Sequence, residues 1–228
     1  MFILIITLII FFWILFRVVV RHTKHSAPPS IFLPAFTDSV QEGDIVCICA
    51  RENKWNAFEL FMRPLIMLTY GTCFIHPVLI TKVGQEKHIL HFTCTPSATS
   101  TDALCHQTDR GTGRQIRGVA YLHNMNDFLE KHIKRQVSPP IYRVYRPPSD
   151  RPLPSYLTLL EQIKPYCGRV CSPTLTCISV LMAVLYKTNM VPTPHHKHTA
   201  YPGVFEKFLV EESGYHYVGD FSVKQDDD

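Results

Sequence analysis

The sequence lacks the short motifs that identify nucleotide-binding and zinc-binding proteins. It has no G-x-G-x-x-G segment and no P-loop, so it gives no support for a nucleotide cofactor. It also has no C-x-x-C pair, and its cysteines and histidines match no common zinc-finger spacing. A solvated histidine loop is therefore favoured over a zinc site for the clustered residues Cys167, Cys171, His195, His196 and His198. We expect no cofactor and no metal.

The chain also lacks clustered basic residues, internal repeats and abundant glycine. Its 23 lysines and arginines exceed its 19 acidic residues by only four, and they are scattered. This pattern excludes the basic, aromatic-rich face of a nucleic-acid-binding protein. The chain has ten glycines and 17 prolines, which predicts extended connections that contain prolines. Its 228 residues are enough for one full-sized domain.

The N-terminus carries one long hydrophobic run. Residues 1–16 are apolar except for Thr7, and Val18–Val20 extend the run to about 20 residues if Arg17 reaches the interface. A cleaved signal peptide is the alternative, but no positive region precedes the run and no small-residue cleavage site follows it. We therefore predict a transmembrane anchor over residues 1–20. The basic residues after it, such as Arg21, place the rest of the chain in the cytosol by the positive-inside rule.

The sequence holds an even number of cysteines, which in a secreted protein would indicate disulfides. Most of them lie within apolar patterns, however, and the predicted orientation favours a reducing compartment. We expect free thiols at Cys47, Cys49, Cys73, Cys94, Cys105, Cys167, Cys171 and Cys177.

The remaining chain divides into a proline-rich linker at 21–39, a folded domain at 40–223 and an acidic tail at 224–228. Strands and helices are mixed within the domain, which indicates an α+β fold. Strands are expected at 45–50, 73–80, 88–94, 118–122, 141–146 and 215–223, with helices at 56–69, from 126, at 155–164 and at 177–189. Residues 95–117 form a long polar loop.

Cys177 stands where the last of these helices begins, and Thr176 before it is suited to the N-cap. Unpaired N–H groups and the helix dipole at that end favour a thiolate, which is the nucleophilic form of cysteine. The simpler interpretation is a buried core cysteine, because free cysteine is among the most buried residue types.

Two histidines provide a partner for this thiol. His76 and His91 lie on consecutive strands that a turn around Gly84 joins, so they should approach one another across an antiparallel pair. His88 and His91 differ by an odd number, so only one of them can share a face with His76. An imidazole is suited to deprotonate a thiol, and a second polar group can orient it.

The order of these parts resembles a known superfamily. The segments Gly43-Asp44-Ile45-Val46, Phe74-Ile75-His76-Pro77-Val78 and Thr176-Cys177-Ile178-Ser179 resemble the circularly permuted branch of the NlpC/P60 papain-like superfamily, and so does the proline-containing stretch Thr199–Phe205. That branch includes YiiX-like and YaeF-like amidases, lecithin retinol acyltransferase-like proteins and a poxviral membrane-associated member. The resemblance covers about residues 40–208.

The resemblance implies an antiparallel sheet packed on a cysteine-bearing helix, with Cys177 as nucleophile, His76 as base and His91 as orienting residue. Pro77 departs from the family pattern, since a proline there favours an edge strand or a bulge. The implied function is a membrane-anchored thiol hydrolase or acyltransferase that cleaves an amide or ester of a lipid-linked or protein substrate. The alternative is a catalytically inactive papain-like fold that serves as a structural or interaction protein in a membrane, for which a large DNA virus and its virion would be a natural source.

Overall fold

The computed structural model describes residues 28–49, 74–96, 116–136, 139–169, 176–192 and 202–225, together with residues 7 and 11–13. Most of the expected anchor at 1–20, the expected helix at 56–69, the histidine loop at 195–198 and the acidic tail at 226–228 lie outside the described residues. None of the helices within the described ranges is long and apolar enough to span a bilayer.

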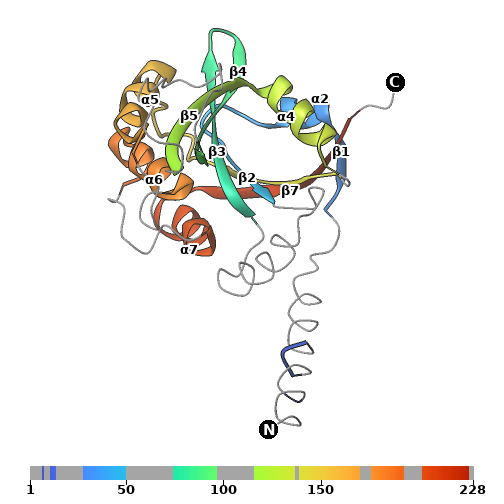
Figure 1. Ribbon diagram of the computed structural model, residues 1–228. Helices are drawn as coiled ribbons and strands as arrows, with labels where there is room; N and C mark the ends of the chain where they lie inside the picture. The colour runs from blue at the N-terminus through green and yellow to red at the C-terminus, as the bar shows by residue number, and fades with distance from the viewer. Residues whose placement is uncertain are drawn as a thin grey trace.

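The described strands form one sheet in the order β1-β7-β6-β2-β3-β4-β5 (Figure 1). Only the β1–β7 pair is parallel, and the other neighbours are antiparallel. The strands are β1 (Ser30–Phe32), β2 (Ile45–Cys49), β3 (Phe74–Val83), β4 (Glu86–Pro96), β5 (Ile116–Asn124), β6 (Ile141–Arg146) and β7 (His216–Lys224). The mixture of this sheet with several helices confirms the predicted α+β class.

The short strand β2 lies near the middle of the sheet because every one of its five residues is apolar and buried. A strand that is covered on both faces reads as a continuous hydrophobic run, and Ile45–Cys49 is such a run. Its odd-numbered residues face one side of the sheet and its even-numbered residues face the other. The sheet is therefore a central layer between two separate cores.

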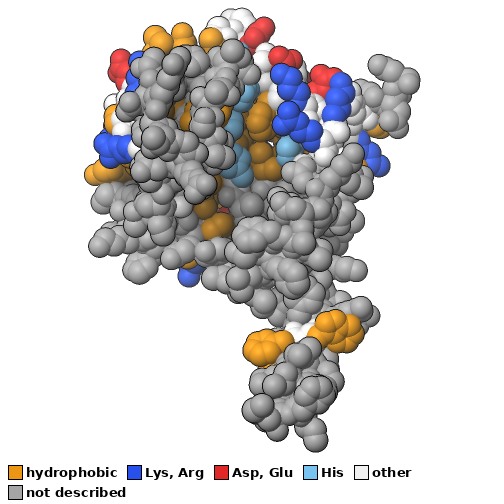
Figure 2. All heavy atoms as spheres, in the orientation of Figure 1, with side chains coloured by type: hydrophobic (Ala, Val, Ile, Leu, Met, Phe, Trp, Pro, Cys, Tyr) orange, Lys and Arg blue, Asp and Glu red, His pale blue; other side chains and the backbone are white. Residues whose placement is uncertain are grey.

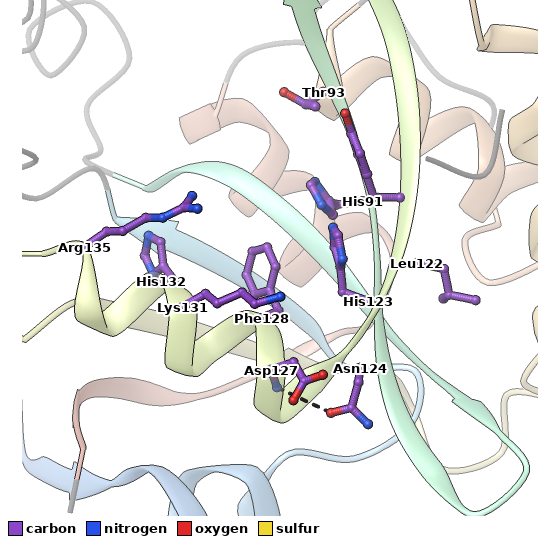
Figure 3. A pocket seen from close by; sticks show the side chains of 11 residues that line it. His91, Thr93, Leu122, His123, Asn124, Asp127, Phe128, Lys131, His132 and Arg135 are labelled. Atoms are coloured by element: carbon purple, nitrogen blue, oxygen red, sulfur yellow. Dashed lines mark hydrogen bonds between the residues drawn. The ribbon is translucent and has the colours of Figure 1, made fainter. Parts of the chain in front are cut away.

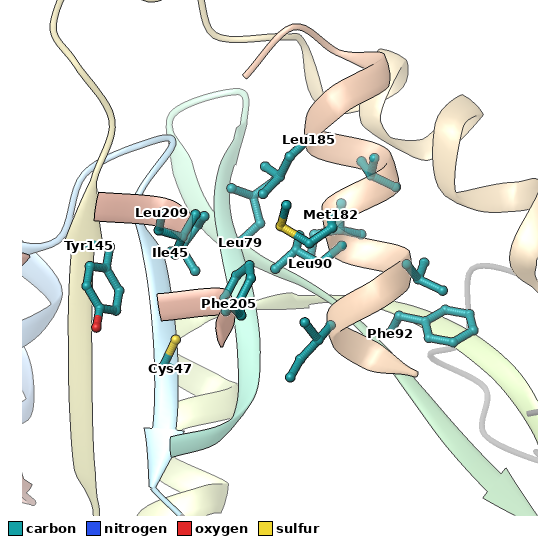
Figure 4. Packing of buried hydrophobic residues seen from close by; sticks show 14 of the residues in the cluster. Ile45, Cys47, Leu79, Leu90, Phe92, Tyr145, Met182, Leu185, Phe205 and Leu209 are labelled. Carbon is teal, nitrogen blue, oxygen red and sulfur yellow. The ribbon is translucent and has the colours of Figure 1, made fainter. Parts of the chain in front are cut away.

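The two cores are covered by different helices. The helical segments are α2 (Leu33–Ser39), α4 (Met125–Lys134), α5 (Tyr156–Ile163), η1 (Lys164–Tyr166), α6 (Cys177–Lys187), α7 (Pro202–Lys207) and the π-helical η3 (Phe208–Glu212). Helices α5, α6 and α7 pack on one face, where Met182 and Leu185 meet Leu79 and Leu90 (Figure 4). Helices α2 and α4 pack on the other face, which we call the α4 face. Two such layers around one sheet are sufficient to bury its hydrophobic strands.

The proline-rich segment before residue 40 is not a free linker. Ser30 and Phe32 pair with β7, and Phe36 of α2 is completely buried against Tyr142. Pro34 lies in the first turn of α2, where its missing N–H removes no helical hydrogen bond. The prediction of a linker up to residue 39 was therefore wrong, since the domain includes residues from at least Ser30 onward.

The expectation for Pro77 holds in one of its two forms, and the expectation for the cysteines needs correction. Pro77 lies on an inner strand rather than an edge, but the β2–β3 register shifts between the pairs Ile48–His76 and Cys49–Phe74, so the expected irregularity lies beside the proline. Cys167 is disulfide-bonded, whereas Cys47, Cys49 and Cys177 are thiols. The expectation of free thiols throughout the chain was therefore wrong at Cys167.

Candidate functional site

The start of α6 has the predicted cap. The side chain of Thr176 accepts a hydrogen bond from the backbone N–H of Ser179 at 3.2 Å, and the Ser179 hydroxyl accepts one from the backbone N–H of Thr176 at 2.8 Å. This reciprocal capping box satisfies two of the helix's unpaired donors and fixes where the helix begins. Cys177 is therefore the first residue of α6.

The Cys177 side chain packs against the core that α5, α6 and α7 cover. Burial raises the pKa of its thiol to about 11, although hydrogen bonds from the backbone N–H groups of Ile178 and Cys177 itself act in the opposite direction. Cys47 of β2 faces the same core, and burial, the Glu206 carboxylate and Cys177 all raise its pKa. The thiol of Cys177 therefore stays protonated at neutral pH.

His76 and His91 meet as predicted. Strands β3 and β4 form an antiparallel hairpin around Gly84, and His76 Nε2 lies 3.2 Å from His91 Nδ1. The rings form an edge-to-face pair with centroids 5.2 Å apart. His91, rather than His88, shares a face with His76. Continued by one pair, the register places His91 opposite Val78, and Val78 is two residues from His76 on β3, so their side chains point to the same side of the sheet.

The two histidines and Cys177 lie on opposite faces of the sheet. His76 and His91 alternate with Leu79 and Leu90, so they project on the side of Val78 and Ile89, which belong to the core of the α4 face. Cys177 packs against the other core, with Leu79 and Leu90. The structure thus brings the predicted base and the predicted orienting residue together, but it does not place the predicted nucleophile beside them.

The histidine pair belongs to a larger group of rings on the α4 face that the sequence did not indicate. His91 stacks on Tyr121 and His123 of β5, with ring centroids 5.2 and 5.4 Å away. Phe128 of α4 packs on His91 and His123 and stacks in turn on His132, at 6.1 Å. We call Tyr121, His123, His91, Phe128 and His132 the ring cluster (Figure 3).

The sequence did not predict the ring cluster, because the sequence patterns that indicate it span only a few residues on each element. The expected strand ended at Leu122, one residue before His123, whereas β5 continues to Asn124. Asn124 caps α4 by accepting from the N–H groups of Asn126 and Asp127, so the helix begins before the expected start at Asn126. Alternation of ring residues on β5 and their spacing of four residues on α4 were the available clues.

The ring cluster lines a hollow of about 670 Å³ between β4, β5 and α4. Figure 2 shows histidine side chains in this depression and lysine and arginine side chains beside it. Lys131 and Arg135, both exposed, line the hollow on the side of α4, and Asp127 lines it near the start of that helix. The site therefore combines aromatic walls with a rim that carries more positive than negative charge.

Burial keeps the imidazoles of His76, His91 and His132 neutral. It lowers the pKa of His76 to about 4, with a smaller contribution from His132. Burial also lowers the pKa of His91 well below its ordinary value, with His76 and His123 acting in the same direction. His132, again mainly through burial, has a lowered pKa, and its Nδ1 lies 2.7 Å from the hydroxyl of Tyr142.

The second nitrogen of His91, Nε2, is one of five buried side-chain polar atoms without a hydrogen-bond partner among the described residues. Nearly all buried polar atoms in proteins have such a partner. The described part of the chain also contains no group of three or more histidine, cysteine or acidic residues placed to hold a metal ion. The members of the ring cluster contact one another chiefly through stacked or tilted rings.

The Cys177 side of the sheet has its own polar cluster. Arg143 of β6 makes two hydrogen bonds to Asp220 of β7, at 2.8 and 2.9 Å, and one of 2.7 Å to Glu206 of α7. The hydroxyl of Tyr145 also donates to Glu206, at 3.0 Å. These charges satisfy one another in a partly buried setting, so they join α7 to the sheet and leave no carboxylate poised as a base.

A comparison of the chain with protein-family models, curated proteins and solved structures found no match.

Proposed function

We propose that this chain is a membrane-anchored protein whose α+β domain is a catalytically inactive relative of the permuted papain-like fold, and that it acts by binding. The observation that carries the proposal is the placement of Cys177 and of the His76–His91 pair on opposite faces of the sheet. A cysteine hydrolase needs its base within hydrogen-bond reach of the thiol.

The electrostatics of the two groups support the same proposal. A catalytic cysteine–histidine pair favours the thiolate and the imidazolium, whose charges stabilise each other. Here burial raises the pKa of Cys177 to about 11 and lowers the pKa of His76 to about 4. Each group is therefore stabilised in its neutral form, which is typical of a thiol and an imidazole that do not act on one another.

The papain-like permutation and the membrane anchor are parts of the proposal that rest on the sequence. The Gly43-Asp44 turn, the histidine strand and the capped Cys177 helix occur in the order that the permuted branch has. The hydrophobic run at residues 1–20 is long enough to cross a bilayer, and the basic residues after it favour a cytosolic domain.

The test is alkylation of the full-length protein in detergent by iodoacetamide, with the modified cysteines identified by mass spectrometry. We expect labelling of Cys177 to keep rising between about pH 6 and about pH 9.5, because the pKa of its thiol, about 11, lies above this range and the reactive thiolate fraction is still increasing. His76→Ala should leave that profile unchanged, as should the control His216→Ala, which alters an exposed histidine of β7.

A hydrolase gives a different result. Labelling of Cys177 that is already maximal near pH 6, and that His76→Ala slows, would establish a reactive thiolate and overturn the proposal. Buried Cys47 and Cys49 serve as internal references for thiols without activation.

A further inference from the structure

We propose that the hollow between β4, β5 and α4 binds a small aromatic anion, that is, a flat ring joined to a phosphate or carboxylate. This inference goes beyond the proposed function and does not depend on it, because its residues lie on the face of the sheet that Cys177 does not occupy. The rings that line the hollow, the unpartnered atom of His91 and the cationic rim each point to a different part of such a ligand.

The ring component is indicated by the inner wall of the hollow. The rings of Tyr121 and His123 are nearly parallel, at 11°, and the ring of His91 is inclined to them by only 19° and 30°. Phe128 approaches from α4 and lies at 30° to His123. Side chains in this arrangement present flat, weakly polar surfaces on which a planar group gains stacking and dispersion energy.

The polar component is indicated by His91 Nε2. Its other nitrogen is held by His76 at 3.2 Å, so Nε2 cannot turn away to find a partner without breaking that contact. A buried imidazole nitrogen without a hydrogen bond destabilises the folded protein unless a ligand or water completes it. His91 lines the hollow, but Nε2 is buried within its wall, so a polar atom of the bound molecule reaches this nitrogen only when the neighbouring rings move apart.

The negative charge is indicated by α4. Lys131 and Arg135 are four residues apart and so lie on one side of the helix, and both line the hollow. Neither forms an ion pair with any described residue, whereas the neighbouring Lys134 is bonded to Glu130 one turn earlier. Two cations on one rim, one of them an arginine, are suited to hold a phosphate or carboxylate.

The size of the site agrees with this ligand class. A hollow of about 670 Å³ falls within the range of pockets that bind small molecules, which extends from about 300 to about 1,000 Å³. It is large enough for a nucleoside monophosphate.

The experiment is calorimetric titration of the full-length protein in detergent with two aromatic anions, AMP and benzoate. Their neutral counterparts, adenosine and benzamide, and inorganic phosphate are titrated in parallel. We expect AMP, benzoate or both to bind at least about tenfold more tightly than the neutral counterpart, because charge-assisted hydrogen bonds are the stronger kind. A preference for AMP over benzoate would assign the anion as a phosphate, and the reverse preference would assign it as a carboxylate.

Variants locate the binding site. Lys131→Ala combined with Arg135→Ala should weaken binding of the preferred anion about tenfold, whereas Lys134→Ala, on the same helix but outside the hollow, should change it less than about twofold. His123→Ala should weaken it about fivefold or more by removing one stacking surface, with retention of the fold checked by circular dichroism.

Three results would overturn the inference. The first is that neither aromatic anion binds more tightly than its neutral counterpart. The second is that phosphate binds as tightly as AMP, which would remove the role of the rings. The third is binding that the Lys131 and Arg135 double variant leaves unchanged.

Discussion

Acidification should destabilise this fold through His76, and the structure sets the size of the effect. The pKa of His76 is about 4 in the folded protein, chiefly because burial disfavours its charged form, against an ordinary value of about 6.5. The unfolded chain therefore binds a proton more readily than the folded chain between these two values. Stability is fully present above about pH 6.5 and falls as the pH is lowered toward 4.

The interval of about 2.5 pH units corresponds to about 3 kcal/mol at about 1.4 kcal/mol per unit, of which about 2 kcal/mol is already lost at pH 5. His91 and His132 also have lowered pKa values and add to the slope. The assay is urea denaturation of the full-length protein in detergent, followed by circular dichroism at several pH values between about 4.5 and 7.5.

The informative comparison is between the wild type and His76→Asn. The amide retains a hydrogen-bonding group toward His91 but binds no proton, so the variant should lose close to one proton from the pH slope near pH 5. His216→Asn, at an exposed position of β7, is the control for replacing a histidine outside the ring cluster. An identical slope in the wild type and His76→Asn would refute a buried, neutral His76.

Three further predictions concern the framework around the site. Asp44→Asn should lower the free energy of unfolding by about 3 kcal/mol and the melting temperature by about 6 to 12 °C. The reason is that Asp44 is completely buried and accepts hydrogen bonds of 3.0 and 2.9 Å from Arg146. A loss below about 1 kcal/mol in thermal unfolding would contradict this. Gly118→Ala should destabilise the domain by about 1–3 kcal/mol, because a Cβ there would overlap the buried ring of Phe92. Phe92→Leu in the same chain should restore part of that loss. If the two changes have additive effects on stability, the contact is not the cause. Deletion of residues 1–24 should release the protein from membranes in a flotation assay, and continued flotation of the truncated chain would place the attachment elsewhere.

The sequence predicted those features that depend on local patterns. The hairpin around Gly84 follows from two apolar strands with a turn between them, and alternation predicts that only one of His88 and His91 shares a face with His76; the strand register makes it His91. The N-cap at Thr176 follows from a hydroxyl residue directly before an apolar helix, whereas the reciprocal bond from Ser179 was not predicted. Such signals involve residues that are close in the sequence, so they can be recognised without knowledge of the tertiary structure.

The features that escaped prediction depend on long-range packing. Alternation on a strand assigns residues to two faces but does not say which face a helix 100 residues later will cover, so the separation of His76 and Cys177 could not be read from the chain. The apolar helix α6 is buried over most of its surface, so its sequence does not select a face either. Similarly, His132 of α4 joins the ring cluster only because α4 packs beside β5.

The most direct test of the account is titration of the Cys177 thiol itself, by the Cβ chemical shift of ¹³C-labelled cysteine in the wild type and in His76→Ala. Cys177→Ser assigns the signal. The account predicts a midpoint for Cys177 above about pH 9 and the same titration curve in both proteins, because partial burial raises the pKa of the thiol and His76 lies on the other face of the sheet. A midpoint below the ordinary thiol value of about 8.5 that rises in His76→Ala would contradict it and restore the cysteine hydrolase.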